Sequence, residues 1–139
     1  MKRRTRDESG ASAVEFALVF PVLALLLFGI ISYGYMFTVR QAMTQAAAEG
    51  ARAGAVAPEG TAVDKASSAV NDALGGTGLK CGERGLVCTT ALDSDCDSAS
   101  GGDCVKVTLT LNYKTFDPFK LPLVPMPGEL EFTSQAEVN

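Results

Sequence analysis

The fold of this chain is set by the run from Phe16 to Arg40, which reads FALVFPVLALLLFGIISYGYMFTVR. It holds 24 uncharged residues, Phe16 to Val39, before its one charge at Arg40. As a helix with a rise of about 1.5 Å per residue, these residues would be about 36 Å long. Because the hydrocarbon core of a bilayer needs about 20 apolar residues, the run predicts one membrane-spanning helix over about residues 16–39.

Charge on either side of the run predicts how the helix is oriented. A leader of residues 1–10 carries four cations and two acids: Lys2, Arg3, Arg4, Arg6, Asp7 and Glu8. From Ala11 onward the chain has 8 basic and 14 acidic residues, a net charge of −6. Since basic flanks stay in the cytoplasm, we expect a cytoplasmic N-terminus and an extracytoplasmic C-terminal part. An acidic exterior argues against a nucleic-acid partner.

A cleaved secretory signal is the alternative interpretation of this N-terminus. The apolar core of such a signal is about 7–15 residues long, shorter than the run found here. The small residues Ala46 to Ala48 could imitate a cleavage site, but they lie well past the run and are better explained as helix. We therefore favour the membrane span.

Glu15 is the unusual residue, because it lies directly before the apolar run. It could be an interfacial carboxylate that reaches water at the helix end. An acid at bilayer depth is, however, a functional hypothesis by default. Cleavage between Gly10 and Ala11 would create an α-amino group four residues earlier, largely protonated at neutral pH. This ammonium group and Glu15 could neutralise each other within a bundle of identical membrane helices.

The same residues carry a family resemblance. The basic leader ending in Gly10, the start Ala11-Ser-Ala-Val-Glu-Phe16, the apolar run and the later Ala48-Glu-Gly-Ala-Arg52 resemble the TadE-like family. Its members are minor pilins, or pseudopilins, of the tight-adherence (Flp-type) pilus system. The resemblance covers about residues 10–56. It implies a pilin-like fold, cleavage after Gly10 by a prepilin peptidase, and assembly at the inner membrane with Flp-type pilins and other pilus-assembly proteins. The chain departs from the family at Ser32-Tyr-Gly-Tyr35, where typical members carry Glu-Phe-Gly-Arg.

The helix is predicted to continue past the membrane, over residues 11–56 in all, because good helix formers follow until Pro58. Small residues recur every four positions along it: Ala42, Ala46, Gly50 and Gly54. Such a face allows close packing, either against partner helices or against the chain's own sheet. The alternative is that an alanine-rich helix shows small residues on every face.

Residues 57–139 are predicted to form an extracytoplasmic α+β head. A second, amphipathic helix should start near Thr61, end at Gly75, and carry one apolar stripe: Val63, Ala66, Val70 and Leu74. Alternating residues predict strands over 105–113 and 130–138, paired as an antiparallel C-terminal hairpin, 105–138. The proline-rich, apolar connection 114–129 could cover the head's own core or dock on the membrane surface or on a pilus partner.

A cysteine-rich loop is predicted over residues 75–104. Its cysteines are Cys81, Cys88, Cys96 and Cys104. In an extracytoplasmic head they predict two disulfides, with three possible connectivities. Reduced cysteine is the alternative, and a zinc site is disfavoured by the wide spacing. A calcium loop starting at Asp93 fails because Ser98 and Cys104 replace its glycine and glutamate. We expect no metal.

The sequence offers no catalytic machinery, so we expect neither an enzyme nor a cofactor. It has no histidine, no Gly-x-Ser-x-Gly and no phosphate-binding glycine loop. Two functions remain. The first is a minor pilin or pseudopilin that takes part in assembling a tight-adherence pilus after leader cleavage. The second is an uncleaved, single-pass membrane-anchored binding module of the cell envelope.

Overall fold

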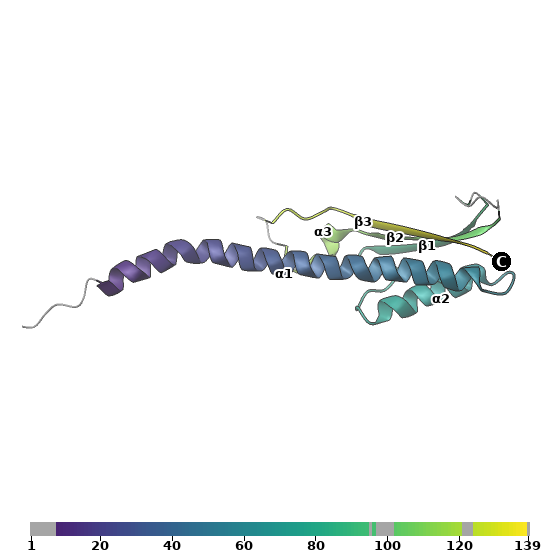
Figure 1. The fold of residues 1–139 in the computed structure, drawn as a ribbon, viewed down its shortest axis with the longest axis horizontal. Helices are drawn as coiled ribbons and strands as arrows, with labels where there is room; N and C mark the ends of the chain where they lie inside the picture. The colour runs from purple at the N-terminus through teal and green to yellow at the C-terminus, as the bar shows by residue number, and fades with distance from the viewer. Residues whose placement is uncertain (1–7, 95, 97–101, 121–123, 139) are drawn as a thin grey trace, which may run out of the picture. The chain divides into compact units, whose positions relative to one another are not determined.

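The computed structural model describes residues 8–94, 96, 102–120 and 124–138. It confirms an α+β fold with a long apolar N-terminal helix, a shorter helix and a small antiparallel sheet (Figure 1). The elements are α1 (Glu8–Ala55), α2 (Ala62–Gly75), β1 (Leu86–Asp93), β2 (Cys104–Leu111), α3 (Tyr113–Phe116) and β3 (Leu130–Glu137). Helix α1 is continuous through Pro21.

The chain divides into two compact units, residues 1–36 and 37–139. Helix α1 contributes to both, and we call the second unit the head. From the sequence, we placed the start of the head at residue 57, directly after the predicted end of the long helix. Packing instead includes residues 37–55 of α1 in the head, because side chains on one face of this part are buried, among them Val39, Met43 and Ala46.

The sheet has the order β1-β2-β3, and all its neighbours are antiparallel. Strands β2 and β3 pair with Leu109 opposite Phe132, which confirms the predicted C-terminal hairpin. The inward side chains of β2 are fully buried: Val105, Val107, Leu109 and Leu111. Its outward side chains, Lys106, Thr108 and Thr110, are half-buried, so one face of the sheet packs and the other is polar.

Helix α2 covers β1 and β2 from the packed side of the sheet. Its buried residues recur with helical spacing: Ala62, Ala66, Val70 and Leu74. Ala62 thus takes the first place on the stripe, where we expected Val63, which is half-buried. At the start of the helix, the hydroxyl of Thr61 donates to the carbonyl of Pro58 at 2.8 Å.

The predicted loop 75–104 is wrong for residues 86–93, which form β1. This strand pairs along its whole length with β2, from Leu86 opposite Leu111 to Asp93 opposite Cys104. Glycine, aspartate and cysteine around it suggested a loop. The strand itself is rich in threonine, valine and leucine, residues that fit a pleated, half-buried surface.

The first predicted strand also ends earlier than expected. Strand β2 stops at Leu111, and Tyr113, predicted as a strand residue, instead begins α3. The side-chain oxygen of Asn112 accepts a hydrogen bond from the backbone N–H of Thr115 at 3.3 Å, which caps the turn. Tyr113 and Phe116 remain buried, with ring centroids 6.2 Å apart, so this part of the proline-rich connection covers the core.

Candidate functional site

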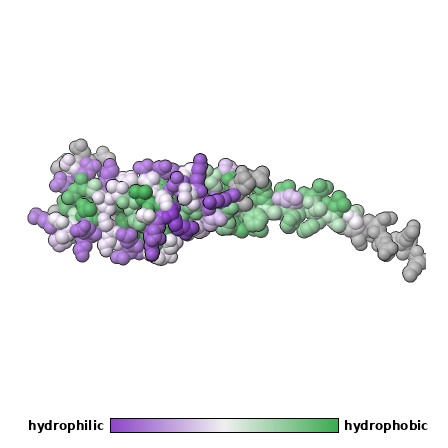
Figure 2. Space-filling view, turned by 180° about the vertical axis from the view of Figure 1, so that it is seen from behind, coloured by the Kyte–Doolittle hydropathy of each residue, from purple (hydrophilic) through white to green (hydrophobic). Residues whose placement is uncertain are grey.

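The N-terminal part of α1 presents an apolar surface to its surroundings. Large side chains there are exposed around the helix, including Leu18 at 73% and Ile30 at 72%. On the face drawn in Figure 2, this stretch is mostly hydrophobic. Among the described residues, one helix is long and apolar enough to cross a membrane, and no part of its most apolar window is buried. A large exposed apolar surface is unfavourable in water, so this helix fits a single-pass membrane anchor.

The three residues predicted for processing and assembly lie at the beginning of this helix. Gly10, Ala11 and Glu15 are all helical and exposed. A Cβ built at Gly10 would have no neighbour within 4 Å. Glu15 lies four residues, about 6 Å along the axis, beyond Ala11. The described chain thus brings a carboxylate close to the Gly10–Ala11 bond, and the roles of these residues stay predictions.

The small residues of α1 lie on the side that packs within the head. Ala42, Ala46, Gly50 and Gly54 are all buried. A Cβ at Gly50 would overlap Cγ2 of Val70. At Gly54 it would lie 2.8 Å from Cγ1 of Val105 and 3.0 Å from the carbonyl oxygen of Ala62. The sequence left open whether this face packs against partner helices or against the chain's own sheet. In the structure, β2 and α2 of the same chain contact the two glycine positions.

Another face of α1 in the head carries a shallow groove that we did not predict. It is lined by Phe37, Arg40, Gln41, Thr44 and Gln45. The guanidinium carbon of Arg40 lies 5.7 Å from the ring centroid of Phe132 on β3. The signal in the sequence was polar residues spaced three and four apart among alanines, which marks an exposed helix stripe.

All four cysteines are paired, which confirms the two predicted disulfides. The bonds join Cys81 to Cys88 and Cys96 to Cys104, with Cα–Cα distances of 5.5 and 5.7 Å. The first ties the turn before β1 to the strand, and the second ties the connection after β1 to the first residue of β2. Each bond therefore closes a short local loop of the head.

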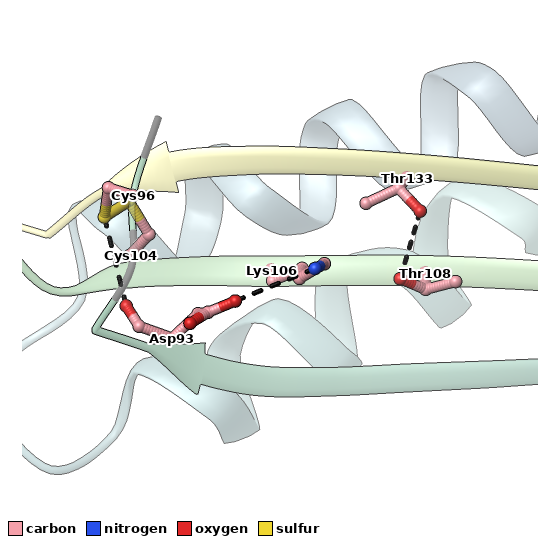
Figure 3. A network of polar contacts seen from close by, with 6 residues as sticks. All are labelled: Asp93, Cys96, Cys104, Lys106, Thr108 and Thr133. Atoms are coloured by element: carbon pink, nitrogen blue, oxygen red, sulfur yellow. Dashed lines mark hydrogen bonds and ion pairs between the residues drawn. A yellow bond between two sulfur atoms is a disulfide. The ribbon is translucent and has the colours of Figure 1, made fainter. Parts of the chain in front are cut away.

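The second disulfide lies beside polar contacts of the sheet (Figure 3). Lys106 Nζ lies 3.7 Å from Asp93 Oδ2, and the hydroxyls of Thr108 and Thr133 are 3.2 Å apart. The Cys96 sulfur lies 3.9 Å from the carbonyl oxygen of Asp93. Because a disulfide sulfur carries no proton, we treat this as a contact without hydrogen bonding. In the described part of the chain, no group of three or more cysteine or acidic side chains is placed to hold a metal ion.

An exposed apolar helix joined to a small disulfide-bonded α+β head fits the class of single-pass membrane-anchored proteins. Residues 10–52 match the family model described as TadE-like protein. The N-terminal part of this chain is thus similar to that family, and the match suggests involvement in the tight-adherence pilus system. Proteins of this family are pilin-like structural components and are not known as enzymes. Comparisons with curated proteins and with solved structures found no match.

Proposed function

We propose that this protein is a minor pilin or pseudopilin, cleaved after Gly10, that takes part in assembling a tight-adherence pilus at the cell membrane. Its partners would be a prepilin peptidase, Flp-type pilins and other pilus-assembly proteins. The observation that carries the proposal is Glu15, an acid on the exposed surface of an apolar helix within the TadE-like segment. The leader would lie in the cytoplasm and the head outside it.

The role of Glu15 follows from the cost of its position. A charged side chain at the centre of a membrane helix costs about 2.5–3.5 kcal/mol on insertion scales, and less near the interface. A new α-amino group at Ala11 would lie one helical turn away, within reach of the carboxylate of the same helix or a neighbouring one. Pairing would offset the cost only when helices come together in one register, so the acid would favour ordered assembly.

The role of Gly10 follows from the helix around it. Helix α1 begins at Glu8, so the Gly10–Ala11 bond lies within its first turn. A peptidase must unwind this turn to reach the bond, and glycine lowers the cost of unwinding by about 1 kcal/mol relative to alanine. No other part of the described chain contacts this position, so a requirement for glycine would come from the peptidase.

The helical first turn also supports the second candidate, an uncleaved membrane-anchored binding module. In this case the Gly10–Ala11 bond stays protected and the groove at Arg40 is available to an envelope ligand. N-terminal sequencing of the protein extracted from membranes separates the two functions. A first residue Ala11 supports the pilin, and an intact leader supports the anchor.

Glu15→Ala is expected to insert into the membrane normally and to abolish assembly, because the helix loses its registering acid. Membrane fractionation measures the first property and electron microscopy of piliated cells the second. The matched control is Glu49→Ala, since Glu49 is an exposed acid of the same helix that lies 3.7 Å from Arg52. Normal piliation by Glu15→Ala would exclude the registering role.

Gly10→Leu is expected to block cleavage, because a side chain at this position should not fit a peptidase groove selected for glycine. Intact-mass measurement should then find the full leader on the protein. Gly29→Leu is the control, because a Cβ at Gly29 also has no neighbour within 4 Å. A mature mass like that of the unmodified protein would count against processing at this bond.

A further inference from the structure

The head starts before the apolar run of α1 ends. Val39 is the last residue of that run, yet it is only 4% exposed and belongs to the head. Arg40, the first charged residue after Glu15, follows directly. With no linker between the apolar run and the head, the end of the head nearest Val39 must lie at the level of the lipid headgroups if α1 spans the bilayer.

The packing register identifies that end of the head. Gly54 faces Val105 and Gly50 faces Val107, so α1 and β2 run in opposite directions. Four helix residues and two strand residues both advance about 6–7 Å. The same spacing brings Leu111 to the level of Ala42, and α3 to the level of Val39.

Exposed basic and aromatic side chains gather around α3. We call them the α3 patch: Arg84, Lys114, Phe119 and Lys120, all exposed. Arg84 belongs to it because its guanidinium carbon lies 4.6 Å from the ring centroid of Phe116. The turn before β1 is bonded to the same place, since the backbone N–H of Asn112 donates to the carbonyl of Gly85 at 3.0 Å.

Charge is distributed unevenly along the head. Five of the eight cations after Ala11 lie near α3: Arg40, Lys80, Arg84, Lys114 and Lys120. The acids of this end are Asp72, Glu83, Asp117, Glu129 and Glu131. Asp117 is buried and its carboxylate accepts from the N–H of Phe119 at 2.9 Å, so it is already used internally. The opposite end is more acidic, with Glu49, Glu59, Asp64, Asp93, Asp103 and Glu137 against Arg52, Lys65 and Lys106.

Two residues of the patch have an unusual backbone. Arg84 and Lys120, with φ of 51° and 39°, are the non-glycine residues with positive φ among those the structure describes. This conformation is unfavourable for an L-residue, and glycine avoids the cost. Strain of this kind clusters at binding sites, and here a cation occupies both positions.

We propose that the α3 patch binds the phosphate groups of anionic phospholipids in the leaflet from which α1 emerges. The cations of the patch would contact the headgroups, and Phe119 would lie at the interface between them. Contact with an anionic surface favours binding about fivefold for each basic residue. The acidic opposite end would be repelled, so the patch would hold the head down on the membrane. This binding does not depend on cleavage or on pilus assembly.

The chain contains no tryptophan, so Phe119→Trp supplies a single fluorescent reporter within the patch. The full chain is reconstituted in vesicles of phosphatidylcholine alone, or of equimolar phosphatidylcholine and phosphatidylglycerol, with brominated acyl chains as quenchers. We expect blue-shifted, quenched emission in the anionic vesicles only. Adding Lys114→Gln and Lys120→Gln should lower the ratio of docked to undocked heads about 25-fold, fivefold for each cation.

The matched control adds Arg52→Gln and Lys65→Gln at the opposite end, which should leave quenching unchanged. If Phe119→Trp unfolds the head, Thr115→Trp on the exposed side of α3 replaces it as the reporter. Equal quenching in both vesicle types would overturn the proposal. Full quenching after the two lysines are neutralised would also overturn it. The reporter would then lie near the lipid only because α1 anchors the head there.

Discussion

The two parts of α1 use side-chain size in opposite ways. In residues 10–36 large apolar side chains point outward and stay exposed, as Leu18 and Ile30 do. In residues 37–55 the buried face holds many small residues beside Val39 and Met43, and Ala46 and Ala47 are at most 1% exposed. The glycines differ in the same way: a Cβ at Gly29 meets nothing, whereas one at Gly54 meets Val105.

This difference fits one continuous helix whose first part meets lipid and whose second part packs in the head. Lipid chains fill any surface, so large apolar side chains that maximise apolar area suit the membrane part. In the head, the helix backbone approaches Val105 and Val107 closely at Gly54 and Gly50, where even a Cβ would be crowded. Each part of the helix therefore has the composition that its partner requires.

Single cysteines should distinguish the two parts of α1 completely. Leu26 and Gln45 are both exposed in the structure, but only Gln45 should face water. All four native cysteines are paired, so an introduced thiol is the one available to a maleimide. Gln45→Cys should react with a membrane-impermeant maleimide added from outside intact cells, and Leu26→Cys only after detergent solubilisation, because a thiolate does not form in hydrocarbon.

Reaction of Leu26→Cys in intact membranes would show that the apolar part of α1 is not covered by lipid. Reaction of Gln45→Cys only after the cytoplasmic side is opened would reverse the predicted orientation. Either result would contradict the division of α1 into a part covered by lipid and a part on the outer side of the membrane.

Leucine in place of glycine should destabilise the head in only one of the two parts. Gly54→Leu inserts a side chain where even a Cβ lies 3.0 Å from the carbonyl oxygen of Ala62, which is backbone. Overpacking of this kind should lower the free energy of unfolding of the head by about 3 kcal/mol. Gly29→Leu should leave it unchanged, since its position is open. Urea unfolding followed by circular dichroism measures both. Equal stability of the two variants would refute close packing at Gly54.

Much of this arrangement could be predicted from local sequence patterns. The span needed only a long uncharged run, and β2 and β3 needed only clean alternation. Likewise α2 needed only residues at helical spacing between Thr61 and Gly75. These patterns are strong because each element meets one apolar environment, either lipid or the core, along its whole length.

The features that the sequence did not predict depend on contacts between residues far apart in the chain. Strand β1 is an edge strand with one covered face, so its pattern was weak and its flanking cysteines suggested a loop. The partner of Gly50 and Gly54 could not be read from α1, because alanines occur on several of its faces. Likewise, Arg40 meets Phe132 and Arg84 meets Phe116 only through the tertiary fold.

The smallest expected effect concerns the two disulfides. Each closes a loop of similar length, 7 and 8 residues apart, so replacing either pair by alanine should cost about 2–3 kcal/mol in the loop-entropy model. They differ in position. Cys104 directly precedes Val105, which faces Gly54, whereas Cys81 and Cys88 lie elsewhere in the head.

A double-mutant cycle separates the two pairs. Gly54→Ala should couple to loss of Cys96–Cys104 by about 0.5–1 kcal/mol, because without this bond the start of β2 can shift away from the added methyl group. Coupling to loss of Cys81–Cys88 should stay within about 0.5 kcal/mol, as for sites without shared neighbours. Denaturant unfolding of the four variants in each cycle measures both values. Equal coupling in the two cycles would mean that the disulfide beside β2 does not hold the strand against the glycine face of α1.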